Sequence, residues 1–245
     1  MARVDWTPFD AALFDLDGVI TPTAIVHMAA WSEMFTDYLT ARSTTTGEAF
    51  APYSDDDYFA YIDGKPRYDG VRAFLASRDI TLPDGDPSDP PTAETVCGLG
   101  NRKNEAFNAV LERDGVAAYP GSVALLDALA ARGTHLAVVS SSRNAPAVLT
   151  AAGLIDRFPV IVDGQVAQAD GLPGKPAPDT FLAAARRLGV PKERAVVLED
   201  AESGVAAGRA GAFGLVVGVD RGAGADRLTE LGADVVVTDL AELLP

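Results

Sequence analysis

The sequence predicts an α/β fold in which helices cover a parallel sheet and a separate helical domain is inserted after the first strand. From residue 121 onward, short apolar segments alternate with helical segments, which is typical of parallel strands joined by helices. An apolar run at 11–16 can supply one more strand of that sheet, although a long helical stretch follows it. We therefore expect residues 1–21 and 116–245 to form the α/β domain and residues 22–115 to form the inserted helical domain.

Composition narrows the class of protein. The chain has 245 residues, of which 48% are hydrophobic, so it can bury a large core. The single Cys97 excludes an internal disulfide, and the first residues lack the apolar segment of a signal peptide, so we expect a cytoplasmic protein. No apolar run approaches the roughly 18 residues of a membrane span. The net charge of -15 repels nucleic acid and anionic membranes. We expect a monomer that binds neither.

The inserted domain begins with a predicted helix at 23–42. Four apolar residues of this helix form one stripe: Ile25, Met28, Phe35 and Leu39. His27 and Trp31 lie four residues apart and share a second face, where they either pack ordinarily or belong to a site near the first strand.

Shorter segments complete the inserted domain. Residues 43–47 are expected to form a loop. Helices are expected at 58–62, 68–78 and 101–113, and residues 83–91 form an acidic, proline-rich loop. The turn after 58–62 carries Lys65 and Arg67, which could reach an anion or could be ordinary solvated charges.

The α/β domain contains the elements that alternate after residue 121. Strands are expected at 135–139, 160–162, 195–198, 215–219 and 234–237, with helices at 121–132, 144–152, 178–188, 203–210 and the C-terminus. In such sheets ligands bind at the carboxyl ends of the strands, so the residues after each apolar run are the candidates for chemistry.

Two carboxylates follow the first apolar run. On a strand, Asp15 and Asp17 point to the same side where the strand stops, and Gly18 lets the chain turn away. Two such close negative charges are tolerable beside a divalent cation, and their oxygen atoms suit Mg²⁺. An Asp-rich turn with no function is the alternative.

Three later segments carry further candidates. Ser140–Asn144 offers hydroxyl and N–H groups at a helix start, which can bind an anion or only cap the helix. Lys175 lies in a loop stiffened by two prolines. Glu199 and Asp200 end an apolar strand, where burial without a cation would be costly.

In this order, Asp15–Val19, Ser140, Lys175 and Glu199–Asp200 resemble the four motifs of the haloacid dehalogenase superfamily of phosphotransferases. The resemblance implies a Rossmann-like core sheet with a cap. It also implies that Asp15 is the nucleophile that becomes an aspartyl-phosphate and that Asp17 is the general acid and base. Mg²⁺ is then held by Asp15, the Asp17 backbone carbonyl and Asp200, with Glu199 close by, and Lys175 offsets negative charge.

Within that superfamily, nearly the whole chain is similar to the β-phosphoglucomutase family. The similarity implies that one set of residues binds the sugar and its phosphates: His27, Trp31, Gly64, Arg67, Lys103, Asn104, Ser140, Ser141, Ser142, Arg143, Asn144 and Lys175. Within this set, Arg67, Ser142, Arg143 and Asn144 contact the distal phosphate, while His27 and Lys103 hold the sugar and position Asp17. The chain departs from the family pattern at Pro22, at Gly70 and in the lengthened loop 171–173, which affects the sugar contacts rather than the phosphoryl chemistry.

The resemblance implies a Mg²⁺-dependent mutase that interconverts β-glucose 1-phosphate and glucose 6-phosphate through β-glucose 1,6-bisphosphate. A sugar-phosphate phosphatase is the alternative, since one fold serves both reactions. A catalytically silent binding protein would have no reason to keep the carboxylates and Lys175 together. The glycine-rich segment 208–214 follows a helix, which argues against a nucleotide-binding dehydrogenase.

Overall fold

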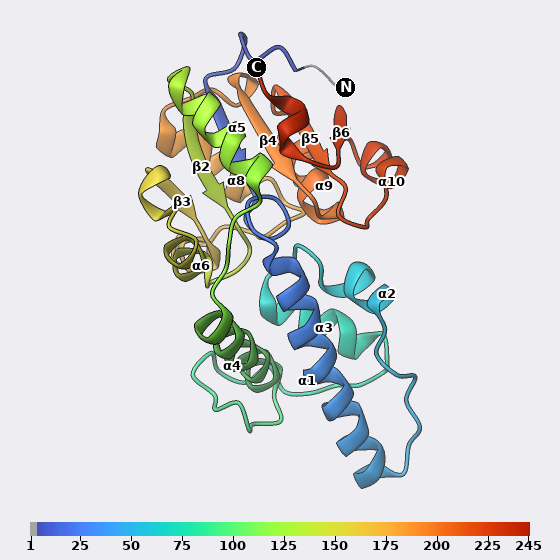
Figure 1. Ribbon diagram of the computed structural model, residues 1–245. Helices are drawn as coiled ribbons and strands as arrows, with labels where there is room; N and C mark the ends of the chain where they lie inside the picture. Colours follow the sequence, from blue (N-terminus) through green and yellow to red (C-terminus); the bar gives the residue numbers. More distant parts are fainter. Residues whose placement is uncertain (1–3) are drawn as a thin grey trace. The chain divides into compact units, whose positions relative to one another are not determined.

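The computed structural model describes residues 4–245 and divides the chain into two compact units (Figure 1). The α/β unit contains the chain up to Thr23 together with Val116–Pro245, and the helical unit contains Ala24–Gly115. Among the described helices, none has the length and apolar character that crossing a membrane requires.

The α/β unit is built on a six-stranded parallel sheet, which confirms the predicted fold class. The strand order is β3-β2-β1-β4-β5-β6. The strands are β1 (Ala11–Phe14), β2 (His135–Val139), β3 (Val160–Val162), β4 (Ala195–Glu199), β5 (Leu215–Val219) and β6 (Val235–Val237).

The central strand β1 sets the position of the candidate residues. All four of its residues are fully buried, as expected for a strand covered on both faces. Phe14 pairs with Val138 of β2 on one side and with Leu198 of β4 on the other. Because the strands are parallel and in this register, the residues that follow β1, β2 and β4 all leave the sheet at the same edge.

Helices pack on both faces of this sheet (Figure 1). They are α5 (Pro120–Ala131), α6 (Ala145–Ala151), α7 (Gly164–Ala169), α8 (Asp179–Leu188), α9 (Glu202–Ala210) and α10 (Ala225–Glu230), with the 3₁₀ turns η2 (Ile155–Arg157), η3 (Lys192–Arg194) and η4 (Leu240–Leu243). Phe181 of α8 is fully buried among apolar side chains of β1, β2 and β4. The expected C-terminal helix is the short turn η4, and α7 and α10 were not anticipated.

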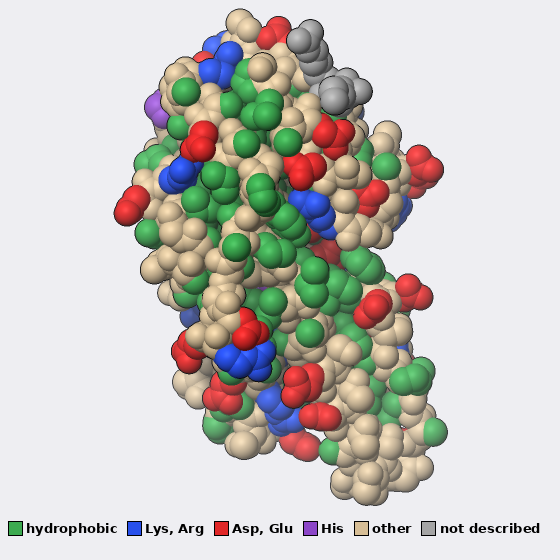
Figure 2. All heavy atoms as spheres, viewed as in Figure 1, with side chains coloured by type: hydrophobic (Ala, Val, Ile, Leu, Met, Phe, Trp, Pro, Cys, Tyr) green, Lys and Arg blue, Asp and Glu red, His purple; other side chains and the backbone are tan. Residues whose placement is uncertain are grey.

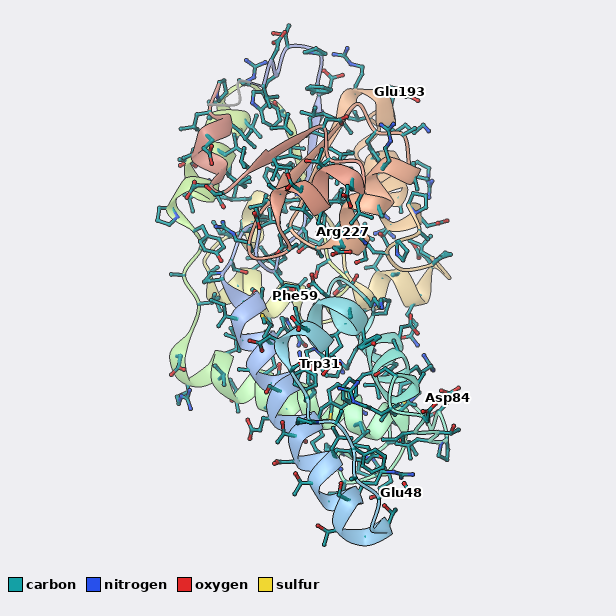
Figure 3. All side chains as sticks on the ribbon, turned by 90° about the vertical axis from the view of Figure 1, so that its right-hand side faces the viewer. Trp31, Glu48, Phe59, Asp84, Glu193 and Arg227 are labelled. Atoms are coloured by element: carbon teal, nitrogen blue, oxygen red, sulfur yellow. The ribbon has the colours of Figure 1, made fainter. Side chains whose placement is uncertain are left out.

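The helical unit has a core of stacked aromatic rings. Its elements are α1 (Thr23–Thr46), α2 (Asp55–Asp57), the π-helix η1 (Tyr58–Ile62), α3 (Arg67–Ala76) and α4 (Val96–Asp114). Phe35 lies at the centre, with its ring centroid 3.9 Å from that of Phe74 and 5.4 Å from that of Trp31. Trp31 is labelled on α1 in Figure 3.

Two expectations for α1 need correction. The predicted stripe is right for Phe35 and Leu39, which are buried, but Ile25 is 68% exposed, and the buried row also contains Trp31, Met34 and Tyr38. The expected loop at 43–47 is helical as far as Thr46, and in this last part of α1 three threonine hydroxyls donate to carbonyls one turn earlier. The helix ends at Gly47, whose φ of 75° is accessible to glycine.

Candidate active site

Asp15 is the first residue beyond β1, and its backbone is held in the sheet. Its N–H donates to the carbonyl of Leu198 at 2.9 Å. The side chain is 10% exposed, and its Oδ1 accepts a hydrogen bond from Lys175 Nζ at 2.6 Å. A buried carboxylate paired with a fixed ammonium, at the edge where the candidate residues leave the sheet, is well placed to meet an anionic substrate.

Lys175 joins the ends of three neighbouring strands. Besides Asp15, its Nζ donates to Glu199 Oε1 at 2.5 Å and to the carbonyl of Val139 at 3.0 Å. The same nitrogen lies 4.9 Å from the centroid of the Phe181 ring. The ammonium is therefore held by three acceptors and is not a mobile surface charge.

Glu199 is fully buried and uses both carboxylate oxygens. Oε1 accepts from Lys175, and Oε2 accepts from the N–H of Ala201 at 2.8 Å. A Cβ atom on Gly204 would lie 1.8 Å from Glu199 Oε1, so only glycine leaves room for this carboxylate at the start of α9.

Burial and charge oppose each other at this cluster. Burial raises the pKa of the Asp15 carboxyl well above its ordinary value, the Lys175 ammonium opposes this, and Glu199 and Asp17 add to it. For Lys175, burial alone would lower the pKa, but Asp15 and Glu199 together raise it above its ordinary value. Lys175 is therefore a permanent cation between the two carboxylates.

The turn after β1 brings Asp17, Gly18 and Asp200 together. Thr23 Oγ1 donates to Asp17 Oδ1, and Thr21 Oγ1 lies 2.8 Å from Thr23 Oγ1. Gly18 has a φ of 88°, and a Cβ atom there would lie 1.8 Å from Asp200 Oδ2. Absence of a side chain at Gly18 therefore lets the Asp200 carboxylate lie against the turn that carries Asp17.

The predicted phosphate loop follows β2. Ser140 is buried, and its Oγ accepts from the N–H of Ser142 at 3.0 Å, while Ser142 Oγ accepts from the N–H of Asn144 at 3.1 Å. Asn144 is the N-cap residue of α6. Ser141 and Arg143 lie in the same turn, half-buried. These bonds give the loop a fixed shape, and its role as an anion site rather than only a helix cap stays a prediction.

In the helical unit, His27, Trp31 and Lys103 form one cluster. The His27 ring stacks on Phe107 with centroids 4.0 Å apart, and Lys103 Nζ contacts His27 Nδ1. The same ammonium lies 5.2 Å from the Trp31 ring centroid. Lys103 is buried. The spacing of four residues that places His27 and Trp31 on one face of α1 therefore brings both side chains to the buried ammonium of Lys103.

Arg67 is not an ordinary solvated charge. Its Nη2 donates to Asn104 Oδ1 at 2.7 Å, and its Nη1 lies 3.4 Å from Asn101 Oδ1. Gly64 precedes it with a φ of 68°. The turn and the two amides direct the guanidinium, and the assignment of Arg67 and Gly64 to phosphate and sugar binding stays a prediction.

Comparison with known proteins places this geometry in a family. The family model of haloacid dehalogenase-like hydrolases matches residues 9–211. The chain belongs to this family. It is 55% identical over 239 residues to the β-phosphoglucomutase of Mycobacterium tuberculosis, covering 96% of this chain and 91% of the relative. It is 32% identical to the β-phosphoglucomutase of Bacillus subtilis, covering 95% of this chain and 91% of that protein.

Solved structures of the family share the fold. A hydrolase from Pseudomonas syringae superposes with a TM-score of 0.77 at 26% identity, covering 96% of both chains. A β-phosphoglucomutase from Clostridium difficile shares the fold as well, with a TM-score of 0.74 at 24% identity, covering 96% of this chain and 93% of that chain.

The donor set of this family member suits a hard divalent cation. Asp15 and Asp200 offer carboxylate oxygens, and the backbone carbonyl of Asp17 is a further oxygen of the same turn. Within residues 4–245, no three His, Cys, Asp or Glu side chains are grouped as a metal site. Glu199 accepts one hydrogen bond at each oxygen, from Lys175 and from the N–H of Ala201, and the predicted metal set of Asp15, Asp17, Glu199 and Asp200 stays a prediction.

Sequence reasoning missed Arg221. It follows β5, and its Nε donates to the carbonyl of Gly18 at 2.8 Å. The rule that identified the other candidates, that residues after parallel strands gather at one edge, also covers this position. Arg221 was not found because no expected motif contains it.

Proposed function

We propose that this chain is a β-phosphoglucomutase, interconverting β-glucose 1-phosphate and glucose 6-phosphate through β-glucose 1,6-bisphosphate. The observation that carries the proposal is a buried Asp15 carboxylate held by Lys175, in a chain 55% identical over almost its whole length to proteins of that name. The substrate is then a small sugar phosphate.

The residues of the α/β unit suit phosphoryl transfer. An Asp15 oxygen attacks phosphorus, the bond from phosphorus to the sugar oxygen breaks, and Asp15 carries the phosphoryl group as an acyl-phosphate. Lys175 lies 2.6 Å from Asp15 and offsets negative charge at the attacking carboxylate. Asp17 donates a proton to the departing sugar oxygen and takes one from the hydroxyl that later receives the phosphoryl group. Mg²⁺, held by Asp15, Asp17 and Asp200, supplies Lewis-acid stabilisation of the phosphoryl oxygens when bound.

A mutase must also bind a second phosphate. We assign this to Arg67, Ser142, Arg143 and Asn144, whose guanidinium, hydroxyl and amide groups suit phosphate oxygens. Two amides hold Arg67, and hydrogen bonds fix the turn of Ser142. In this proposal the helical unit, which is the inserted domain that resembles the family's cap, contributes His27 and Lys103 to sugar binding.

A phosphatase is the second candidate. The family is described as hydrolases, and the solved relative from Pseudomonas syringae is also called a hydrolase. In that case water takes the phosphoryl group from Asp15 and free phosphate is released. A single fold supports both outcomes, so the product decides between them.

Phosphorus NMR of the purified protein with β-glucose 1-phosphate, Mg²⁺ and a trace of β-glucose 1,6-bisphosphate tests the proposal. We expect glucose 6-phosphate to accumulate without inorganic phosphate. EDTA should stop the reaction and added Mg²⁺ should restore it, while Asp15→Asn should be folded but inactive because an amide cannot form the acyl-phosphate. Accumulation of free phosphate in place of glucose 6-phosphate would move the assignment to the phosphatase.

A further inference from the structure

Arg221 connects three parts of the α/β unit. Its Nε donates to the carbonyl of Gly18 at 2.8 Å, and its Nη1 donates to the carbonyl of Thr238 at 2.8 Å. Its guanidinium carbon lies 4.1 Å from the ring centroid of Tyr119. The side chain thus links the turn after β1 to the segment after β6 and to the start of α5.

Gly18 needs external support to keep one conformation. Glycine has the largest backbone freedom of any residue, and Gly18 adopts a φ of 88° directly after Asp17. Its N–H donates to the carbonyl of Thr21 at 2.7 Å, and its Cα face lies against Asp200. Arg221 binds the one remaining group, the carbonyl, so that all three sides of this residue are fixed.

Tyr119 and its neighbours support Arg221 from the other side. The N–H of Tyr119 donates to the carbonyl of Ile20 at 2.9 Å, and Ser122 Oγ donates to the carbonyl of Val19 at 2.7 Å. The start of α5 is therefore bonded to the same turn that Arg221 holds. Burial raises the pKa of the Tyr119 hydroxyl, Arg221 opposes this and Asp200 adds to it, which places both charges near that hydroxyl.

Stability alone gives a poor account of Arg221. Its Nη2 is buried without a hydrogen-bond partner within the described chain. An unsatisfied buried donor is costly, and this cost offsets part of what the two carbonyl contacts contribute. The Arg221 guanidinium is better explained by the geometry that it imposes on the turn after β1.

We propose that Arg221 is a positioning residue for phosphoryl transfer: by fixing the Gly18 peptide, it holds the Asp17 backbone carbonyl and the Asp200 carboxylate in the geometry that cation binding and proton transfer require. This inference rests on the proposed phosphoryl transfer at Asp15. Arginine suits the role because its planar fork reaches two carbonyls while its face stacks on an aromatic ring. Lysine at this position would keep the charge but lose the fork and the stacking.

The test compares Arg221→Met and Arg221→Lys with the wild type in two measurements. The first is steady-state conversion of β-glucose 1-phosphate at saturating Mg²⁺. We expect Arg221→Met to lower kcat about 10- to 100-fold with KM within about twofold, because small displacements of reacting groups are this costly. Arg221→Lys should recover only part of the loss.

The second measurement does not depend on turnover. The melting temperature is followed as Mg²⁺ is added to substrate-free protein, since a ligand that binds the folded state raises it. We expect Arg221→Met to move the midpoint of this titration to about 10- to 100-fold higher Mg²⁺, the range known for residues that orient metal ligands. If the wild type does not convert the sugar phosphate, the proposed function fails, but this titration still tests the role of Arg221.

A matched control is Arg187→Met on α8, whose guanidinium pairs with Asp170 at 2.6 Å and is about two-fifths exposed. It should leave both measurements unchanged. If Arg221→Met does not fold, Arg221→Lys and Tyr119→Leu, which removes the stacking ring, decide the question. The proposal is overturned if the folded variants keep kcat and the Mg²⁺ midpoint within twofold of the wild type, even if their melting temperatures fall, because Arg221 would then be structural only.

Discussion

At the scale of single residues, the site depends on one ammonium shared by two buried carboxylates. Lys175 lies 2.6 Å from Asp15 and 2.5 Å from Glu199, and each of these three side chains is almost or fully buried. The sequence predicted all three as site residues, because each follows an apolar strand or lies in a stiff loop. The pairing of Lys175 with Glu199 was not predictable, since sequence order does not say which residues at a sheet edge touch.

Removing this ammonium should affect stability as well as activity. Lys175→Met keeps most of the stem volume but leaves Asp15 and Glu199 facing each other without a cation. Removing one partner of a buried ion pair typically costs about 3–5 kcal/mol, so we expect a loss of this size in the free energy of unfolding. Urea denaturation of the variant measures it.

The control for this prediction is Lys192→Met. Lys192 donates a single hydrogen bond of 2.8 Å to the carbonyl of Gly211 from a half-buried position, and its loss should cost about 1 kcal/mol. Equal and small losses for the two variants would mean that the Lys175 cluster contributes no more than an ordinary contact.

The proposed acid–base role of Asp17 can be tested by comparing substrates with poor and good leaving groups. Thr23 donates to Asp17 Oδ1, which orients the carboxyl beside the turn. Asp17→Ala leaves Asp15 able to attack but removes proton transfer, which is typically worth 10²–10⁴-fold. We expect sugar phosphates to lose this factor, while acetyl phosphate, which has a better leaving group, loses much less. Parallel assays of both substrates give the ratio, and equal losses would remove Asp17 from the acid–base role.

At the scale of elements, the strands were easier to predict than the short helices. Fully buried parallel strands are continuous apolar runs, so β1, β2, β4 and β5 were found within two residues of their observed ends. The six-residue helices α7 and α10 give too short a pattern for helical periodicity to be recognised.

Helix α1 shows a second limit of sequence reasoning. Several apolar sets fit a helical period in a segment rich in hydrophobic residues, and tertiary packing decides which set is buried. The aromatic stacking of Trp31, Phe35 and Phe74 selects the observed row, while Ile25 of the predicted stripe stays exposed. That contact joins two helices far apart in sequence, so the local pattern could not reveal it.

The turn after β1 can be tested through Gly18. Gly18→Ala adds a Cβ that would lie 1.8 Å from Asp200 Oδ2 and also places alanine at a φ of 88°. The carboxylate must move, so we expect weaker Mg²⁺ binding and a large fall in kcat, in addition to about 1 kcal/mol of backbone destabilisation. Calorimetric titration with Mg²⁺ and steady-state assays check both effects.

Gly133→Ala isolates the backbone contribution. Gly133 follows α5 with a φ of 79°, and a Cβ there would meet nothing within 4 Å. This variant should lose a similar backbone energy but keep Mg²⁺ binding and activity. If both alanine variants behave alike, the close approach of Asp200 to Gly18 is not functionally important.

At the scale of the whole molecule, the protein and its proposed sugar phosphate substrate are both negatively charged. Acidic and basic side chains are interspersed over the face in Figure 2, and the chain has a net charge of -15. A sugar bisphosphate must therefore be bound by local cations. The fold supplies these in two places: Lys175 in the α/β unit, and Lys103 and Arg67 in the helical unit. Under the proposed function, only a mutase needs both.

Arg67 therefore offers the sharpest test of the molecule as a whole. Arg67→Ala removes a guanidinium that Asn104 holds at 2.7 Å, and under the proposed function it also removes a bidentate contact to the distal phosphate of the bisphosphate. We expect conversion of β-glucose 1-phosphate to fall at least about 10-fold, since a charge-assisted contact is worth roughly 1.5–3 kcal/mol. Hydrolysis of acetyl phosphate, which has no second phosphate, should stay within about twofold.

Arg72 provides the matched control because it belongs to the same helix, α3. Its guanidinium pairs with Asp69 and Asp84, each at 2.7 Å, and is nearly half exposed. Arg72→Ala should leave both activities unchanged, since surface ion pairs contribute little. Both activities are measured on one preparation of each variant. If Arg67→Ala lowered neither activity, Arg67 would have no second phosphate to hold, and a phosphatase acting on simple phosphate esters would explain the site better than a mutase.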